Sequence, residues 1–562
     1  MLLDWLQRLI VNGWILAGLF GALVYLAVAG PGPLDVTNTG WIFEQTDITG
    51  AYMGWSFYRD APWSAAIADN PLYGMDFSGS ILFSDAIPLM AIPFKALSPM
   101  LPEQFQYFGL WTFLNFVLQG VFGWLLMSRA TDNALARILG AILISLTPLY
   151  IYRLVYPECT HMSLTAHWLV LGALYLCLPP HTRRPWLWWG LLLAAVAFVH
   201  AYLFCMVAAL WLADLVRRGF LDFRKTWIEP LGIALTVGGL VWVTGVWSGP
   251  AGEMDGGFGW FKMNLLGLID PSSRPTSNWS YVVPDMPNWG GDYEGYAFVG
   301  LGGLILAGVA AWALPGIRKQ LSLSILLPYW PFAMALLGMA IFSVSRNATL
   351  GTVNFYLPWP GFLHYLGELF RSTGRFIWPL YYALFFVGVL IASRRLPART
   401  LCMILAGAAI VQAIDTSRGW TSDGAYLRQP SSTFQTALVS PFWDQAETRY
   451  DAVRLAPYKN MDPRFPEVTT MARAHGMTTD AAYLARIRTT AAKDSRARIE
   501  RGIATGEWPQ DTLFVLDEPI ARRILETNDP TKNFVGRVDG MLVLAPGWTG
   551  CSDCGAVSLA SP

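Results

Sequence analysis

Residues 105–127 read FQYFGLWTFLNFVLQGVFGWLLM and contain no charged side chain. A helix needs about 20 predominantly apolar residues to cross the hydrocarbon core of a bilayer. This stretch is long enough, and similar stretches recur along the first three quarters of the chain. The sequence therefore predicts a mainly α, polytopic membrane protein with about eleven transmembrane helices. The expected spans are 14–30, 105–127, 135–153, 163–179, 186–199, 201–216, 227–248, 297–314, 322–343, 376–393 and 399–415.

The composition agrees with this class of protein. Of the 562 residues, 54% are hydrophobic and only 14% are charged, whereas soluble domains carry about 25% charged residues. The 26 tryptophans suit membrane–water boundaries, where one end of the ring is dry and the other wet. The net charge is zero, so nothing favours a nucleic-acid partner.

Lysines and arginines in the short loops predict the orientation, because cytoplasmic loops are enriched in them. One set of alternate loops is rich in lysine and arginine, and the other set contains fewer of them. We therefore expect a cytoplasmic N-terminus and an extracytoplasmic segment after residue 416. An alternative for the first apolar stretch is a signal peptide, since AVA-G at 27–30 is typical of a cleavage site. The basic loops contain Arg129, Arg137, Arg183, Arg184, Arg217, Arg218, Arg224, Lys225, Arg318, Lys319, Arg394, Arg395 and Arg399.

Two regions are then expected: a transmembrane region at 1–415 and a small extracytoplasmic α/β domain at 416–562. The first region has long outer loops at 31–104 and 249–296. Within 31–104, the apolar stretch 80–98 is interpreted as an interfacial helix, since counting it as a span would place the basic loops outside.

In the C-terminal domain, 451–457, 512–516 and 541–545 resemble buried strands, and 465–475, 480–504 and 519–527 resemble helices. Cys551 and Cys554 form a CxxC motif. A small disulfide loop is the plainer interpretation, and a redox or metal role is the alternative.

Several outer residues are candidates for chemistry. Asp47 begins a segment whose Tyr52, Trp55 and Tyr58 recur at helical spacing, which predicts a helix with an aromatic face on the membrane. Asp47 is either a helix cap or a general base. Asp85 is a carboxylate in an apolar stretch, which marks either a site or an outward-facing side chain.

Arg371 and Arg375 are four residues apart, so a helix would place both on one face. Two guanidinium groups suit a phosphate. The alternative is that they anchor the chain to lipid headgroups.

The loop 249–296 contains Asp292, Tyr293 and Glu294 among aromatic residues, a composition that suits sugar rings as well as ordinary loop packing. Glu158 and His161 are expected near the same side, where interfacial histidines are more plausible than metal ligands because no zinc spacing is present. No cofactor is indicated, and the sequence leaves a metal requirement open.

These pieces together resemble the GT-C superfamily of membrane glycosyltransferases, best over the first third of the chain. The resemblance rests on the order Asp47, Tyr52, Trp55, Arg59, Trp63 and then DAIPLMAIPFKALS at 85–98. LTPLY at 146–150 is similar to a segment of aminoarabinose and protein mannosyl transferases. YEGY at 293–296 and FRSTGRF at 370–376 resemble a bacterial subfamily with an extracytoplasmic C-terminal domain.

The resemblance implies a polyprenyl-phosphate-linked sugar as donor, Asp47 as the catalytic carboxylate, and substrate contacts near Arg59. Many relatives have a second acidic residue in the first motif, but here Ile48 follows Asp47. We expect an inverting glycosyltransferase in a bacterial inner membrane that uses a glycan, lipid or protein acceptor on the periplasmic side. The alternative is a transporter or flippase of a lipid-linked precursor.

Overall fold

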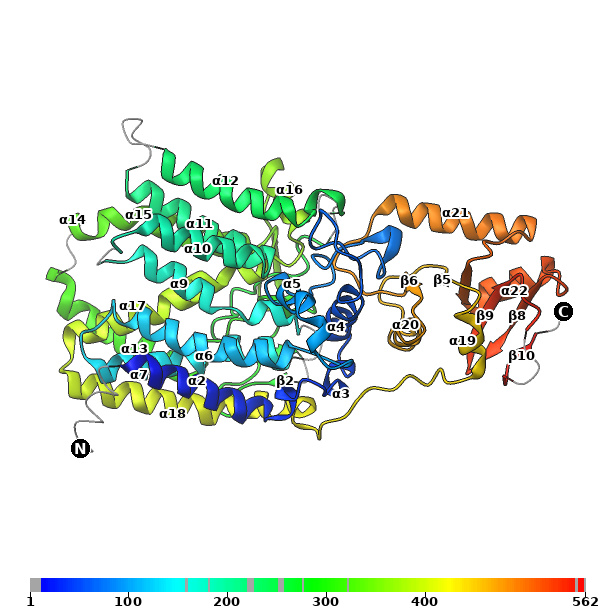
Figure 1. Ribbon diagram of the computed structural model, residues 1–562. Helices are drawn as coiled ribbons and strands as arrows, with labels where there is room; N and C mark the ends of the chain where they lie inside the picture. Colours follow the sequence, from blue (N-terminus) through cyan, green and yellow to red (C-terminus); the bar gives the residue numbers. More distant parts are fainter. Residues whose placement is uncertain are drawn as a thin grey trace. The chain divides into compact units, whose positions relative to one another are not determined.

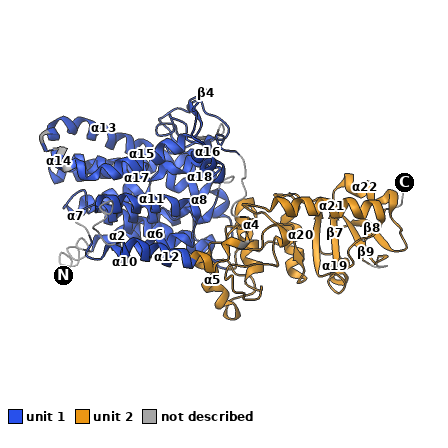
Figure 2. Cartoon of the chain, turned by 90° about the horizontal axis from the view of Figure 1, so that it is seen from above, with its two compact units in different colours: residues 1–36, 107–240, 254–430 blue, residues 37–106, 241–253, 431–562 orange. Residues whose placement is uncertain are grey.

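The computed structural model describes residues 12–156, 160–179, 182–219, 227–250, 257–274, 277–320, 323–550 and 554–559. The chain is mainly helical and divides into two compact units (Figures 1 and 2). The first comprises residues 1–36, 107–240 and 254–430, and the second comprises 37–106, 241–253 and 431–562. The outer loop expected at 31–104 therefore groups largely with the C-terminal segment rather than with the transmembrane region that surrounds it in sequence.

The first unit is a bundle of apolar helices. Each span expected from the sequence contains at least one helix, and the span at 135–153 is broken into α7 and α8, bent by 42°. In the described part of the chain, five helices are long and apolar enough to cross a membrane, or six if that bent pair is one span. The helices are α2 (Gly13–Ala29), α6 (Phe108–Met127), α7 (Ala134–Ser145), α8 (Pro148–Val155), α9 (Trp168–Cys177), α10 (Pro185–Ala197), α11 (Ala201–Arg217), α12 (Ile228–Val243), α13 (Gly300–Ile317), α14 (Leu323–Leu326), α15 (Trp330–Val344), α16 (Gly361–Leu369), α17 (Trp378–Arg395) and α18 (Ala398–Asp423).

Helices α2 and α6 pack closely through small residues, as is common where helices meet without a hydrophobic driving force. A Cβ atom on Gly120 of α6 would lie 2.1 Å from the carbonyl oxygen of Ala17 on α2. A Cβ atom on Gly21 of α2 would lie 2.0 Å from the carbonyl oxygen of Phe116 on α6. Backbone atoms cannot yield as a side-chain tip can, so only glycine permits this approach.

Gly120→Ala is therefore expected to destabilise the protein by about 1–3 kcal/mol through overpacking. Gly308→Ala in α13 is the matched control, because no atom lies within 4 Å of the added methyl group. Thermal unfolding of the purified variants in detergent measures both. Equal unfolding midpoints for the two variants would contradict the close α2–α6 contact.

The second unit contains a six-stranded sheet with strand order β10-β8-β9-β7-β5-β6. β5 is parallel to β6 and β7, whereas β7, β9, β8 and β10 pair antiparallel. The elements are α3 (Gly40–Phe43), α4 (Thr46–Tyr58), α5 (Pro88–Ala96), α19 (Pro441–Ala446), β5 (Ala452–Ala456), α20 (Phe465–Ala474), β6 (Thr478–Thr479), α21 (Thr489–Thr505), β7 (Thr512–Leu516), α22 (Glu518–Thr527), β8 (Asn533–Val538), β9 (Met541–Pro546) and β10 (Val557–Ser558).

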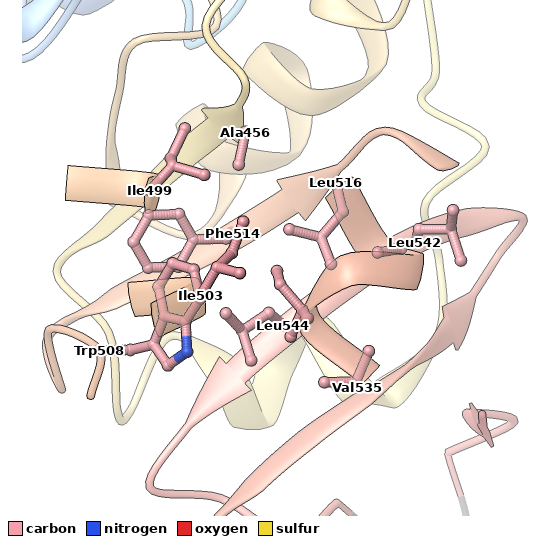
Figure 3. Packing of buried hydrophobic residues seen from close by; sticks show 11 residues of the cluster. Ala456, Ile499, Ile503, Trp508, Phe514, Leu516, Val535, Leu542 and Leu544 are labelled. Atoms are coloured by element: carbon pink, nitrogen blue, oxygen red, sulfur yellow. The ribbon is translucent and has the colours of Figure 1, made fainter. Parts of the chain in front are cut away.

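The core of this sheet is formed by apolar side chains from α21, α22 and the strands (Figure 3). Ile499 and Ile503 of α21 pack with Phe514 and Leu544 of the sheet, beside Trp508. The α/β character expected for the C-terminal segment is thus confirmed. Cys554 is disulfide-bonded, in line with the plainer expectation for the CxxC motif, while Cys551 lies outside the described residues.

Two expected helices differ from the structure. The helix expected over 480–504 begins only at Thr489. Residues 480–488 are irregular, and Ala485 and Arg488 donate backbone hydrogen bonds to Phe83 and Phe77 of the 31–104 segment. The interfacial helix expected over 80–98 is limited to α5, Pro88–Ala96. Tertiary hydrogen bonds prevail over helix propensity in the first case.

Candidate functional site

The most strongly charged buried cluster in the first unit surrounds the carboxylate of Glu294. Arg375 donates to both of its oxygens, from Nε at 2.9 Å and from Nη2 at 2.6 Å. Arg153 donates from Nη1 to the carboxylate at 3.0 Å and from Nη2 to the Glu294 carbonyl oxygen at 2.7 Å. All three side chains are buried, so a fork of charge-assisted hydrogen bonds fixes the cluster.

Three separate segments supply this cluster. Glu294 lies in the short helix η6 (Asp292–Gly295), Arg153 in α8, and Arg375 in the short helix η9 (Thr373–Ile377). Aromatic rings cover the guanidinium groups: Arg375 lies over Tyr202 at 4.8 Å and Arg153 over Trp378 at 5.1 Å. The rings exclude water and strengthen the ion pairs.

The pKa of Glu294 reflects this arrangement. Burial alone would raise it, but the charges of Arg375 and Arg153, hydrogen bonds from Arg375 and a smaller contribution from His161 outweigh burial and lower the pKa. The carboxylate is therefore ionised at neutral pH, and the cluster stays charged.

The prediction that Arg371 and Arg375 share one helical face is wrong. Helix α16 ends at Leu369, Arg371 has a positive φ of 22°, and η9 begins at Thr373. Because the helix is interrupted between them, the two arginines have different neighbours. Arg371 is half-buried with its guanidinium 5.1 Å from the centre of the Phe261 ring, whereas Arg375 is committed to Glu294.

Asp292 and Tyr293 are likewise held by the protein. Asp292 is buried and accepts hydrogen bonds from Lys262 at 3.0 Å and from Asn264 at 2.8 Å. The ring of Tyr293 packs against Tyr156 and Phe261. The carboxylates of the 249–296 loop that were expected to line a sugar site thus tie the loop to itself and to the helix ends.

In the second unit, Asp47 lies in the first turn of α4 and is partly exposed. The cap position is Gln45 rather than Asp47. The helix itself was predicted correctly, but its aromatic residues form no exposed face: Tyr52, Trp55 and Tyr58 are buried inside the protein. Helix α4 is thus largely buried, with the partly exposed Asp47 in its first turn.

Arg59 and Asp85 lie in the same unit but have different surroundings. Arg59 donates from Nη1 to the carbonyl oxygens of Pro102 at 3.0 Å and Glu103 at 2.7 Å, so it ties the end of α4 to the segment after α5. Asp85 is half-buried with a φ of 58° in a turn before α5, not on the helical face expected.

Glu158 lies outside the described residues. His161 occupies the N-cap position of the short helix η4 (Met162–Thr165), without a side-chain capping hydrogen bond, and is half-buried. Among the residues that the structure describes, no group of three His, Cys, Asp or Glu side chains is arranged to hold a metal ion.

Arg153 and Lys262 were missed by sequence reasoning although each pairs with a residue that was singled out. Arg153 ends the apolar run 135–153, and a cation at such a position is expensive unless it is paired. That cost could have indicated that Arg153 has an acidic partner. Lys262, in a long polar loop, carried none.

Arg454 of β5 links two of the three segments that form the second unit, 37–106 and 431–562. It pairs with Asp76 at 3.0 Å and with Asp480 at 3.4 Å. Asp480 is fully buried, and burial raises its pKa to about 6 although the charge of Arg454 opposes the shift.

This shift predicts a pH dependence of stability. The folded state holds a proton on Asp480 that the unfolded state releases near the ordinary pKa of 3.8. The contribution of Asp480 to the free energy of unfolding is therefore complete below pH 3.8. It is lost, by at most about 3 kcal/mol, as the pH rises to about 6. Asp480→Asn should remove this slope in thermal unfolding between pH 4 and 7, and an unchanged slope would refute the assignment.

The apolar bundle and the appended α/β sheet define a helical membrane protein with a C-terminal domain. The chain belongs to the family described as "Domain of unknown function (DUF6311)", whose model matches residues 18–417. The model described as "DUF6311 C-terminal domain" matches residues 442–546. No curated protein matches the chain.

Proposed function

We propose that the protein is a membrane glycosyltransferase that moves a sugar from a polyprenyl-phosphate-linked donor to an acceptor hydroxyl on the periplasmic side of a bacterial inner membrane. The observation that carries the proposal is the position of Asp47 in the first turn of the buried helix α4. From Ile48 to Trp55 every residue of α4 is buried, whereas Asp47 remains partly exposed. A carboxylate in the first turn of a buried helix is held in a fixed position, which suits general base catalysis.

In this mechanism Asp47 accepts the proton of the acceptor hydroxyl as its oxygen attacks the anomeric carbon of the sugar. The new C–O bond forms on the face opposite the phosphate, so the configuration inverts. The bond from the anomeric carbon to the phosphate oxygen breaks, and the polyprenyl phosphate leaves with the electron pair.

The two arginines that the sequence suggested for a leaving phosphate lie in the first unit. Charge that grows on a leaving phosphate is stabilised by fixed cations. Arg375 is held by Glu294, and Arg371, half-buried beside Phe261, stays a candidate contact for a phosphate as the sequence predicted. Arg153 lies in the last turn of α8, a position that suits a charged group near a membrane surface.

Release of polyprenyl phosphate in membranes tests the proposal. Membranes containing the wild-type protein are incubated with candidate polyprenyl-phosphate-linked sugars and total envelope glycan, and are compared with membranes containing an equal amount of Asp47→Asn. Wild-type-dependent release that the variant lacks supports the transferase. Transport of intact donor without release would favour the transporter or flippase.

A further inference from the structure

The segment between α15 and α17 carries an apolar surface that the proposed function does not use. It contains a hairpin of β3 (Asn347–Leu350) and β4 (Val353–Tyr356), followed by α16 (Figure 2). All four residues of β4 are exposed. The exposed side chains are large: Tyr356 is 71% and Phe362 68% accessible, and Leu350, Val353, Phe355, Leu357, Tyr365 and Leu366 are exposed as well.

The charge pattern of this segment is unlike that of a water-facing loop. No charged residue stands between residues 347 and 363. Arg346 and Glu368, which flank the stretch, lie 4.0 Å apart and face each other. Contiguous exposed apolar patches of this kind mark a partner or a membrane.

The neighbours of the segment identify what covers it. Leu327–Val344 precedes it and Thr373–Arg395 follows it, and both are long and apolar enough to cross a membrane. The segment therefore connects two consecutive spans and lies at the level of one membrane surface. Aromatic residues such as Phe355, Tyr356 and Tyr365 are favoured at that level.

We propose that the β3–β4 hairpin and α16 insert their exposed apolar side chains into one leaflet of the bilayer. The occupant of the surface is the lipid at the boundary between headgroups and acyl chains. Full insertion into the hydrocarbon is disfavoured, because the free edge of β4 would leave backbone groups without hydrogen-bond partners there. The segment thus lies in the interface, with the side chains reaching inward. The inference does not depend on sugar transfer.

Spin-label accessibility tests the proposal in the full-length protein. Phe355→Cys and Phe362→Cys are made separately in a background with Cys159, Cys177, Cys205 and Cys402 replaced by alanine, labelled with a nitroxide and reconstituted in phospholipid vesicles. Collisions with oxygen, which concentrates in lipid, are compared with collisions with a water-soluble nickel complex. Val439→Cys, at a 77% exposed position of the second unit, is the water control, and Met403→Cys in α18 is the lipid control.

The expected result is a ratio of oxygen to nickel collisions several-fold higher at positions 355 and 362 than at 439, approaching that at 403. A ratio equal to that at 439 would overturn the proposal, since the segment would face water. Low collision rates with both reagents would also overturn it, because a protein partner or second copy would then cover the surface. If either variant fails to fold, Tyr356→Cys supplies the same readout from a more exposed position.

Discussion

Asp47→Asn is expected to lower the initial rate of sugar transfer by the purified protein by about 10²–10⁴-fold, the usual contribution of a general base. An amide has the shape of the carboxylate but cannot take the proton from the acceptor hydroxyl. The buried residues of α4, from Ile48 to Trp55, are unchanged, so the fold should survive. The measurement is the initial rate at equal protein and saturating donor, with the thermal midpoint recorded alongside.

Glu44→Gln is the matched control for that variant. Glu44 is an exposed carboxylate three residues before Asp47. The substitution removes the same charge and leaves the proposed base in place. The control should keep the wild-type rate. Equal losses in the two variants would attribute the effect to local charge and remove Asp47 from the mechanism.

Glu294→Gln is expected to destabilise the protein by about 3–5 kcal/mol, the typical cost of removing one partner from a buried ion pair. The substitution leaves the guanidinium groups of Arg153 and Arg375 buried beside a neutral amide, which no longer compensates their charge. Denaturant or thermal unfolding in detergent micelles measures the loss.

Glu518→Gln provides the comparison, because Glu518 pairs with Arg537 at 3.4 Å on the exposed surface of the second unit. Surface ion pairs contribute at most about 1 kcal/mol. If Glu294→Gln lowered the free energy of unfolding as little as Glu518→Gln does, the Glu294 cluster would not be buried away from water, which would contradict the structure.

The helices of the bundle could be predicted from sequence because a long uncharged apolar run has few other uses. Where a span breaks was not predictable, although Pro148 follows the break and suits a helix start. Strand β8 was missed even though Asp539 and Gly540 stand between it and β9 with positive φ. An Asp-Gly pair between apolar runs is a strong hairpin indication, so this miss was avoidable.

The candidate site was predictable only as separate residues. Glu294 and Arg375 were each singled out, but they are 81 positions apart, and nothing in the sequence specifies which cation a buried carboxylate meets. Both were expected to contact substrate, because a charged residue near a membrane surface suits a ligand as well as an internal partner. For the aromatic residues of α4, periodicity predicted the helix, but aromatic rings suit both lipid and a protein core.

The most direct test of the proposed transferase is product analysis in sealed vesicles reconstituted with purified protein, isotope-labelled polyprenyl-phosphate-linked sugar and an acceptor glycan. Mass spectrometry follows the labelled sugar. The account predicts labelled acceptor together with an equal amount of free polyprenyl phosphate, and neither product with Asp47→Asn. Intact donor that has crossed the bilayer, with no labelled acceptor, would contradict the account and identify a flippase.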